Sequence, residues 1–195
     1  MYLNQSIKKA STPKDILKGW GNLVFAEILS LLVNLFTVNF MNNSTILRGI
    51  VGIFTMAILV CIVGNYIYNV AKRDKASERT FKTPHKEYKH ILLAVTTSAP
   101  LVLQWLVLLI YRVQNLNPTF LNTKVSLLAV YKILNAYFLP WINVFNLEPI
   151  LTDLSVMAMV TMFAFTIVPA ITIVVVYPIV YNSIDIQKIL MYDKE

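Results

Sequence analysis

The segment from Lys72 to His90 reads KRDKASERTFKTPHKEYKH and is a polar island in an otherwise apolar chain. It holds seven lysines and arginines, three acids and both histidines of the protein. Apolar runs long enough to span a membrane flank it on both sides. A segment this rich in Lys and Arg between two such runs is typical of a cytoplasmic loop. We therefore predict a membrane protein whose orientation is set by a cytoplasmic loop over residues 72–90.

The overall composition agrees with a membrane protein. The chain has 195 residues, of which 57% are hydrophobic and only 14% are charged, whereas a soluble domain carries about 25% charged residues. One spanning helix needs about 20 apolar residues, so the chain has room for four or five spans and little else. We expect a single helical membrane domain over residues 1–195.

The net charge of +7 is concentrated before the first apolar run and in the 72–90 segment. This distribution is typical of charge that sets membrane orientation and attracts anionic lipid headgroups, and it argues against nucleic-acid binding. The bilayer surface is therefore an expected partner. The basic residues expected to face headgroups are Lys72, Arg73, Lys75, Arg79, Lys82, Lys86 and Lys89.

Four apolar runs are predicted to span the membrane, at about 20–40, 46–70, 91–113 and 154–181. The run over 125–147 is also long enough, but Lys132, Asn135 and Pro140 interrupt it. If it crosses, there are five spans and the C-terminus is outside. If it is interfacial or re-entrant, there are four spans and both termini are cytoplasmic, which the C-terminal lysines favour. We predict an all-α polytopic protein of the cell membrane, with four transmembrane helices and one interfacial or re-entrant segment.

Polar residues in the first predicted span follow a helical spacing. Glu27, Ser30, Asn34 and Thr37 are separated by three, four and three residues, which places them on one helix face. An ionisable group inside a span is costly and marks a functional site by default. For Glu27 this means a proton relay, cation coordination or the anchor of a polar substrate. The alternative is an interhelical hydrogen bond, and the expected partners are Asn65, Thr97 and Gln104.

Small residues in the second predicted span suggest a helix-packing face. Ala57, Cys61 and Asn65 are four residues apart, with Gly64 beside them. Small residues at this spacing let two helices approach closely. The same holds for Gly49 and Gly52 near the other end of the span.

Prolines predict breaks in the later spans. Pro100 lies in the third span, and Pro169 and Pro178 lie in the last one. Each proline removes a backbone donor and clashes with the carbonyl of the preceding turn. We expect helix kinks at all three positions.

The sequence contains no motif for a metal, a cofactor or a catalytic centre. His85, Glu87 and His90 lie in a lysine-rich stretch and are best interpreted as a solvated helix start. The single cysteine, Cys61, rules out a multi-cysteine site. There is no HExxH, no GxSxG, no P-loop and no Gly-rich dinucleotide fingerprint. We expect no metal, no cofactor and no enzymatic activity.

The sequence therefore favours a non-catalytic helical membrane subunit. It would act with other membrane subunits, such as those of a transporter, or by self-association. The first alternative is a small oligomeric transporter or channel with a polar pathway around Glu27. The second is an intramembrane enzyme with Glu27 as acid or base, which lacks a partner residue.

Overall fold

The computed structural model describes residues 11–82, 88–119, 125–145 and 150–192, without the side chains at 40, 42, 43, 144, 145 and 184–192. These residues form helices and one isolated bridge between Thr119 and Ser126. The helices are α1 (Thr12–Asn43), α2 (Thr45–Phe81), α3 (Lys89–Val113), α4 (Leu127–Leu134), α5 (Leu139–Phe145), the short 3-10 helix η2 (Leu151–Asp153), α6 (Val156–Thr166) and α7 (Val168–Tyr192).

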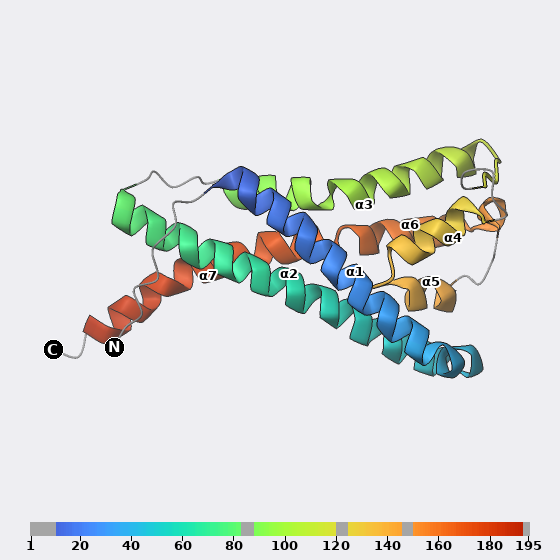
Figure 1. Ribbon diagram of the computed structural model, residues 1–195, viewed down its shortest axis with the longest axis horizontal. Coiled ribbons are helices and arrows are strands. Elements are labelled where there is room, and N and C mark those ends of the chain that lie inside the picture. Colours follow the sequence, from blue (N-terminus) through green and yellow to red (C-terminus); the bar gives the residue numbers. More distant parts are fainter. Residues whose placement is uncertain (1–10, 83–87, 120–124, 146–149, 193–195) are drawn as a thin grey trace.

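Four helical segments are long and apolar enough to cross a membrane. They are Thr12–Asn39, Thr45–Phe81, Lys89–Val113 and Val156–Ser183, the last combining α6 with most of α7. The predicted all-α polytopic fold with four spans is confirmed. The start of α1 and the end of α7 lie at the same end of the bundle, which we call the basic end because it carries the 72–82 segment (Figure 1).

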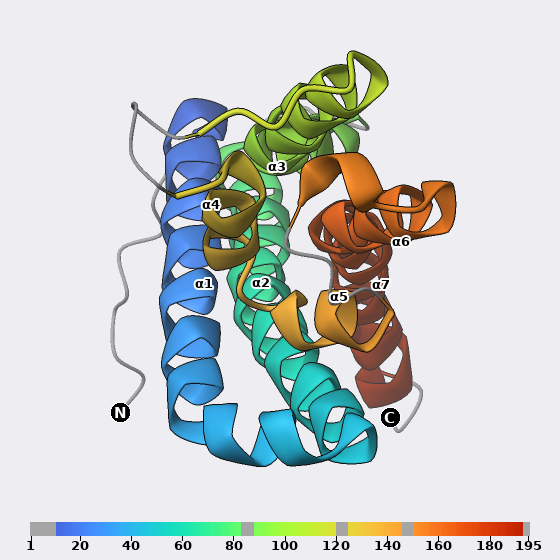
Figure 2. The same ribbon diagram turned by 90° about the vertical axis from the view of Figure 1, so that its right-hand side faces the viewer.

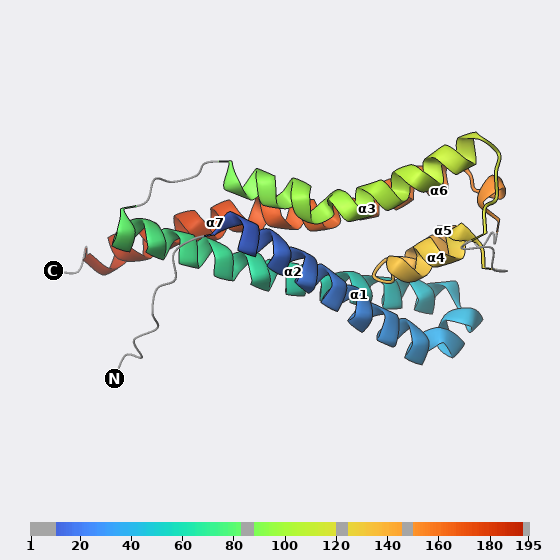
Figure 3. The same cartoon turned by 45° about the horizontal axis from the view of Figure 1, so that its top comes forward.

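The segment over 125–147 forms a helical hairpin. α4 runs from the end opposite the basic end to the middle of the bundle, a turn over residues 135–138 reverses the chain, and α5 returns (Figure 1). Figure 3 shows α3 diverging from α1 and α2 toward that opposite end, with the hairpin in the wedge between them. Figure 2 shows α2 beside α1 and α7, the helices with which it makes its most extensive contacts. The four-span alternative with a re-entrant segment therefore describes the fold.

The polar island is mostly helix rather than loop, which corrects the prediction for 72–90. α2 continues without interruption to Phe81, and α3 begins at Lys89. Helical periodicity explains the continuation, because Val70, Asp74 and Ser77 recur on one face and are buried. Counting apolar residues located the end of the hydrophobic part of α2, near position 70, but not the end of the helix.

The three predicted kink positions differ in outcome. Pro169 coincides with a break, since α6 ends at Thr166 and α7 begins at Val168. α3 continues through Pro100 and changes direction along its length (Figure 3). α7 also continues through Pro178.

Carbonyls freed by prolines receive donors from other parts of the chain. Pro100 cannot donate to the Thr96 carbonyl, and the Trp20 indole donates to it at 2.8 Å. Pro169 leaves the carbonyl of Phe165 without its helical donor, and the Tyr137 hydroxyl lies 3.3 Å from it. Side chains thus replace backbone hydrogen bonds where the helices are broken.

At the end opposite the basic end, Arg48 of α2 links its own helix to α1 and α5. Its guanidinium donates to the Met41 carbonyl near the end of α1, at 3.0 and 3.2 Å. It also donates to the Asn143 carbonyl of α5 at 2.8 Å. The last carbonyls of a helix lack intrahelical donors, so Arg48 satisfies one of them while holding α5 in place.

Gly52 allows the hairpin to approach α2, as its sequence position suggested. A Cβ at position 52 would lie 2.7 Å from the indole nitrogen of Trp141 in α5 and 3.0 Å from Cε2 of the same ring. Gly49 differs, because a Cβ there would meet nothing within 4 Å. Of these two glycines, only Gly52 is therefore required for the packing of α5 on α2.

Gly52→Ala should lower stability by about 1–3 kcal/mol, because the new methyl group forces Trp141 out of its place. Gly49→Ala is the matched control and should be neutral or slightly stabilising, because alanine favours the helix. Thermal unfolding of the two variants and the wild type in detergent measures the difference. Equal stability of the two variants would show that α5 does not pack on Gly52.

Candidate functional site

The turn between α4 and α5 is the most deeply buried non-helical backbone of the described chain. Asn135, Ala136, Tyr137 and Phe138 are all 0% exposed. We call residues 135–138 the hairpin tip. Non-helical backbone at membrane depth is tolerated only where protein or water satisfies its polar groups. The fold therefore requires hydrogen-bond partners for the polar backbone groups of the tip.

Side chains of α1 and α2 satisfy the carbonyls of the tip. Asn34 donates from Nδ2 to the Ala136 carbonyl at 2.7 Å. That carbonyl has no helical donor because residue 140 is a proline. Thr55 donates from Oγ1 to the Tyr137 carbonyl, also at 2.7 Å. The two long helices thus bind the backbone of the hairpin directly.

Glu27 also faces the backbone of the tip. Its carboxyl group is directed toward the backbone N–H groups of Ala136 and Tyr137. Both carboxyl oxygens are buried, and neither has a hydrogen bond of ordinary geometry to the residues that the structure describes. The expected partner Asn65 is exposed. Glu27 is therefore placed against the tip amides and not against a polar side chain of α2.

Two amide side chains complete the surroundings of the tip. Asn135 donates from Nδ2 to Gln104 Oε1 of α3 at 2.9 Å and to the Tyr131 carbonyl at 3.0 Å. Within the described chain, the side-chain oxygens of Asn34 and Asn135 are buried without a hydrogen-bond donor. The tip is thus surrounded by acceptors that still have hydrogen-bonding capacity.

The predicted polar face of α1 is only partly directed at the tip. Ser30 is fully buried, and its hydroxyl lies 3.5 Å from the Thr55 carbonyl. Thr37 instead donates to the Val33 carbonyl of its own helix at 2.7 Å. Glu27, Ser30 and Asn34 therefore contact other elements, whereas the hydroxyl of Thr37 returns to α1.

A cavity of about 280 Å³ lies beside Glu27, between α1, α3 and the end of α4. Its wall is almost entirely apolar, and Gln104 is its other polar side chain besides Glu27. The residues at its rim, such as Val24, Ile28, Ile133 and Leu134, are exposed. The lining consists of Trp20, Leu23, Val24, Glu27, Ile28, Leu31, Pro100, Leu101, Gln104, Ile133 and Leu134.

Lys132 is the cation nearest to the hairpin tip in sequence. Its ammonium group lies 3.4 Å from the Asn143 side-chain oxygen, so that it links α4 to α5. Burial lowers the pKa of Lys132, because the charged form loses hydration. It supports the hairpin and does not contact the Glu27 carboxyl.

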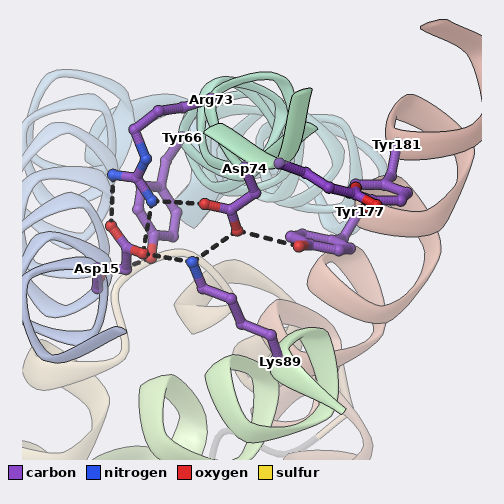
Figure 4. A network of polar contacts seen from close by, with 8 residues as sticks. Asp15, Tyr66, Arg73, Asp74, Lys89, Tyr177 and Tyr181 are labelled. Carbon is purple, nitrogen blue, oxygen red and sulfur yellow. Dashed lines mark hydrogen bonds and ion pairs between the residues drawn. The ribbon is translucent and has the colours of Figure 1, made fainter. Parts of the chain in front are cut away.

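A second buried polar cluster joins all four spans at the basic end (Figure 4). The Arg73 guanidinium holds both carboxylate oxygens of Asp15 at 2.7 and 2.8 Å and reaches Asp74 at 2.9 Å. The Lys89 ammonium lies 2.6 Å from Asp74 and 2.8 Å from Asp15. Tyr177 of α7 donates to Asp74 at 3.0 Å. We call Asp15, Arg73, Asp74 and Lys89 the ion-pair cluster; it contains two charges of each sign.

Further tyrosines strengthen this end of the bundle. The Tyr66 hydroxyl donates to the Asp15 carbonyl at 2.6 Å, and the Tyr181 hydroxyl donates to Glu78. The Lys75 ammonium lies 4.5 Å from the centre of the Tyr181 ring. Sequence reasoning missed this cluster because acids among many lysines look like solvated charge. The signal was Arg73-Asp74, placed one helical turn beyond the end of an apolar run.

The headgroup-facing assignment is accordingly corrected. Arg73 and Lys89 are paired with buried carboxylates, and Lys75 is largely covered by Tyr181 and Glu78. Lys72, Arg79 and Lys82 are exposed, as expected for residues at a headgroup surface. Lys86 lies outside the described residues.

Among the described residues, most of the predicted packing face of α2 is not covered. Ala57, Cys61 and Asn65 are exposed, and Gly64 is half-buried with α7 beside it, where a Cβ would lie 3.9 Å from Thr172. α2 instead uses the face of Gly52, Thr55 and Leu59 for the interior. Small residues four apart occur on both faces, and the spacing alone does not distinguish them.

No group of three or more His, Cys, Asp or Glu side chains that could hold a metal occurs among the described residues. His90 stacks on Tyr177 with ring centres 5.7 Å apart. His85 and Glu87 lie outside the described residues. Comparison with known protein families, with curated proteins and with solved structures gives no match.

Lys89→Met should destabilise the protein by about 3 kcal/mol, because it leaves two buried carboxylates with a single cationic partner. Lys72→Met is the matched control and should change stability little, since Lys72 is exposed. Adding Asp74→Asn to Lys89→Met should recover part of the loss by restoring the charge balance. Thermal or denaturant unfolding in detergent tests this, and additive effects of the two substitutions would contradict a coupled cluster.

Proposed function

We propose that the protein is a small membrane transport protein in which Glu27 carries a proton at the hairpin tip. The observation that carries this proposal is the position of the Glu27 carboxyl against the amides of a broken helix inside the bundle. Ionisable residues inside spans mark ion pathways and proton relays. Discontinuous helices form the central sites of many transporters.

The surroundings of Glu27 suit both of its protonation states. The ionised carboxylate faces the N–H groups of Ala136 and Tyr137. A protonated Glu27 needs an acceptor, and the buried oxygens of Asn34 and Asn135 beside the same tip have no donor among the described residues. Each state therefore offers the tip different hydrogen bonds. This difference couples the proton to the position of the hairpin.

Substitution of Glu27 separates the structural role from transport. Glu27→Gln keeps an acceptor oxygen for the tip amides and should remain close to wild type in thermal stability. Glu27→Leu removes the acceptor and should lose about 1 kcal/mol, within the range of hydrogen bonds between membrane helices. In vesicles with a trapped pH dye and an imposed potential, wild type should move protons and Glu27→Gln should not.

Asp153→Asn is the matched control for that experiment. It also removes one carboxylate, but from an exposed position away from the tip. It should keep wild-type proton movement. Equal flux in the Glu27→Gln variant, or none in the wild type, would refute the proton pathway.

A second candidate function is that of a non-catalytic subunit of a larger membrane assembly. Its support is the exposed stripe of Ala57, Cys61, Asn65 and Asn69 on α2. Asn65 and Asn69 present side-chain amides on a membrane-spanning helix, where polar groups favour contact with another helix. Oxidative or bifunctional cross-linking through Cys61 in native membranes should then give a discrete larger species. Recovery of monomer alone would exclude a helix packed on this stripe.

We further propose that the basic end faces the cytoplasm and that the protein resides in the cell membrane. Lys72, Arg79 and Lys82 are exposed at this end, and positive residues favour the cytoplasmic side. In a Cys61→Ala background, Lys82→Cys should react with an impermeant thiol reagent only after lysis. Labelling of intact cells would reverse the orientation.

A further inference from the structure

We propose that the cavity between α1, α3 and α4 binds a neutral, lipid-soluble molecule that carries a carbonyl group. This inference goes beyond proton transport and does not depend on it, because the Glu27 carboxyl is directed at the hairpin tip. Glu27 also lines the cavity, but because its carboxyl is directed at the tip, Gln104 is the polar side chain that we consider for an occupant.

The orientation of the Gln104 amide is fixed by its neighbour. Asn135 Nδ2 donates to the Tyr131 carbonyl, which accepts only, so the nitrogen of Asn135 must lie on that side. The same nitrogen lies 2.9 Å from Gln104, which must therefore present its oxygen there. The Gln104 nitrogen then faces away from Asn135 and donates to none of the described residues. An occupant with a hydrogen-bond acceptor would satisfy this donor.

The depth of Gln104 narrows the class of occupant. It lies fifteen residues after Lys89 and nine before Val113, or about 22 and 13 Å along the helix at about 1.5 Å per residue. Phospholipid chains have no acceptor at this depth, since their ester groups lie near the headgroups. An acyl chain would leave the donor unpaired, which costs free energy in an apolar site. A ring-borne carbonyl, as in quinones and related ketones, reaches this depth without a charge.

The size and opening of the cavity agree with such a molecule. An apolar cavity of about 150 Å³ is enough to bind benzene, and this one measures about 280 Å³. Val24 and Ile28 on one side of the rim and Ile133 on the other are exposed, so the cavity opens toward the bilayer. Toward the basic end, α1 and α3 are in close contact, since a Cβ at Gly19 would lie 2.8 Å from Thr97 Oγ1. Entry is therefore lateral, from the lipid.

Trp20 lines the cavity and provides an optical probe. We would titrate the full-length protein in detergent with a decyl-substituted benzoquinone, whose ring quenches tryptophan fluorescence on contact. The expected result is saturable quenching that is lost in Trp20→Phe. Gln104→Leu should weaken binding about tenfold, the effect of one hydrogen bond in an apolar site.

A matched pair of variants tests the location without disturbing the core. Val24→Phe fills the rim from a position that is 57% exposed and should abolish saturable quenching. Val175→Phe places the same ring on the exposed surface of α7, outside the cavity, and should bind like wild type. Thermal unfolding of each variant verifies that it is folded.

Three results would overturn the inference. Quenching that rises linearly in all variants would reflect partition into the micelle only. Saturable quenching that is equal in wild type and Gln104→Leu would exclude recognition of the carbonyl. A change of oligomeric state in Val24→Phe, without saturable quenching in wild type, would show that another protein chain covers the cavity.

Discussion

The structure depends on one constraint, the hydrogen-bonding of a non-helical turn in the interior of a membrane bundle. In the membrane interior the backbone N–H and C=O groups of the hairpin tip need hydrogen-bond partners, and side chains of the bundle can provide them. Asn34 and Thr55 donate to its carbonyls, and Glu27 faces its amides. Polar side chains of α1 and α2 thereby provide hydrogen-bonding groups for the backbone of residues 135–138.

The ion-pair cluster imposes a second constraint, at the basic end of the bundle. Two carboxylates, one guanidinium and one ammonium are buried together and balance in charge. Replacing such a group with apolar side chains is often neutral in stability, whereas removing one member is costly. The cluster is therefore weak evidence for net stability, and its balance of charge makes each member dependent on the others. It fixes the register of α1, α2 and α3 at one end, where Tyr177 links α7 to it. At the other end the hairpin lies between α3 and the pair of α1 and α2 (Figure 3).

The sequence predicted what depends on hydrophobic length and failed where a tertiary partner decides. The four spans and the re-entrant segment follow from apolar runs and from Lys132, Asn135 and Pro140, which break one of them. The polar face of α1 was identifiable from its spacing. Its partner was not, because the acceptors and donors are backbone groups of a turn that carries no sequence signal.

The errors at the basic end have the same origin. Arg73 and Lys89 lie in the same lysine-rich segment as exposed Lys72, and their pairing with Asp15 and Asp74 depends on how the helices approach one another. Likewise, the small residues of α2 lie on two faces. Composition cannot tell which face meets Trp141 and which meets lipid or another chain. The number of helices was therefore predictable, but the pairing of their polar groups was not.

The helices of the bundle differ in whether prolines interrupt their backbone hydrogen bonds. α1 and α2 have no proline beyond the first turn of α1, whereas α3 and α5 each contain one and α7 contains two. Of the side chains that bind the broken backbone, Trp20, Asn34 and Thr55 belong to α1 and α2. Tyr137 of the hairpin tip, which binds the Phe165 carbonyl, does not. Glu27 belongs to α1 and faces the hairpin tip, so in the transport role that we propose, a change in its charge acts on the hairpin from an unbroken helix.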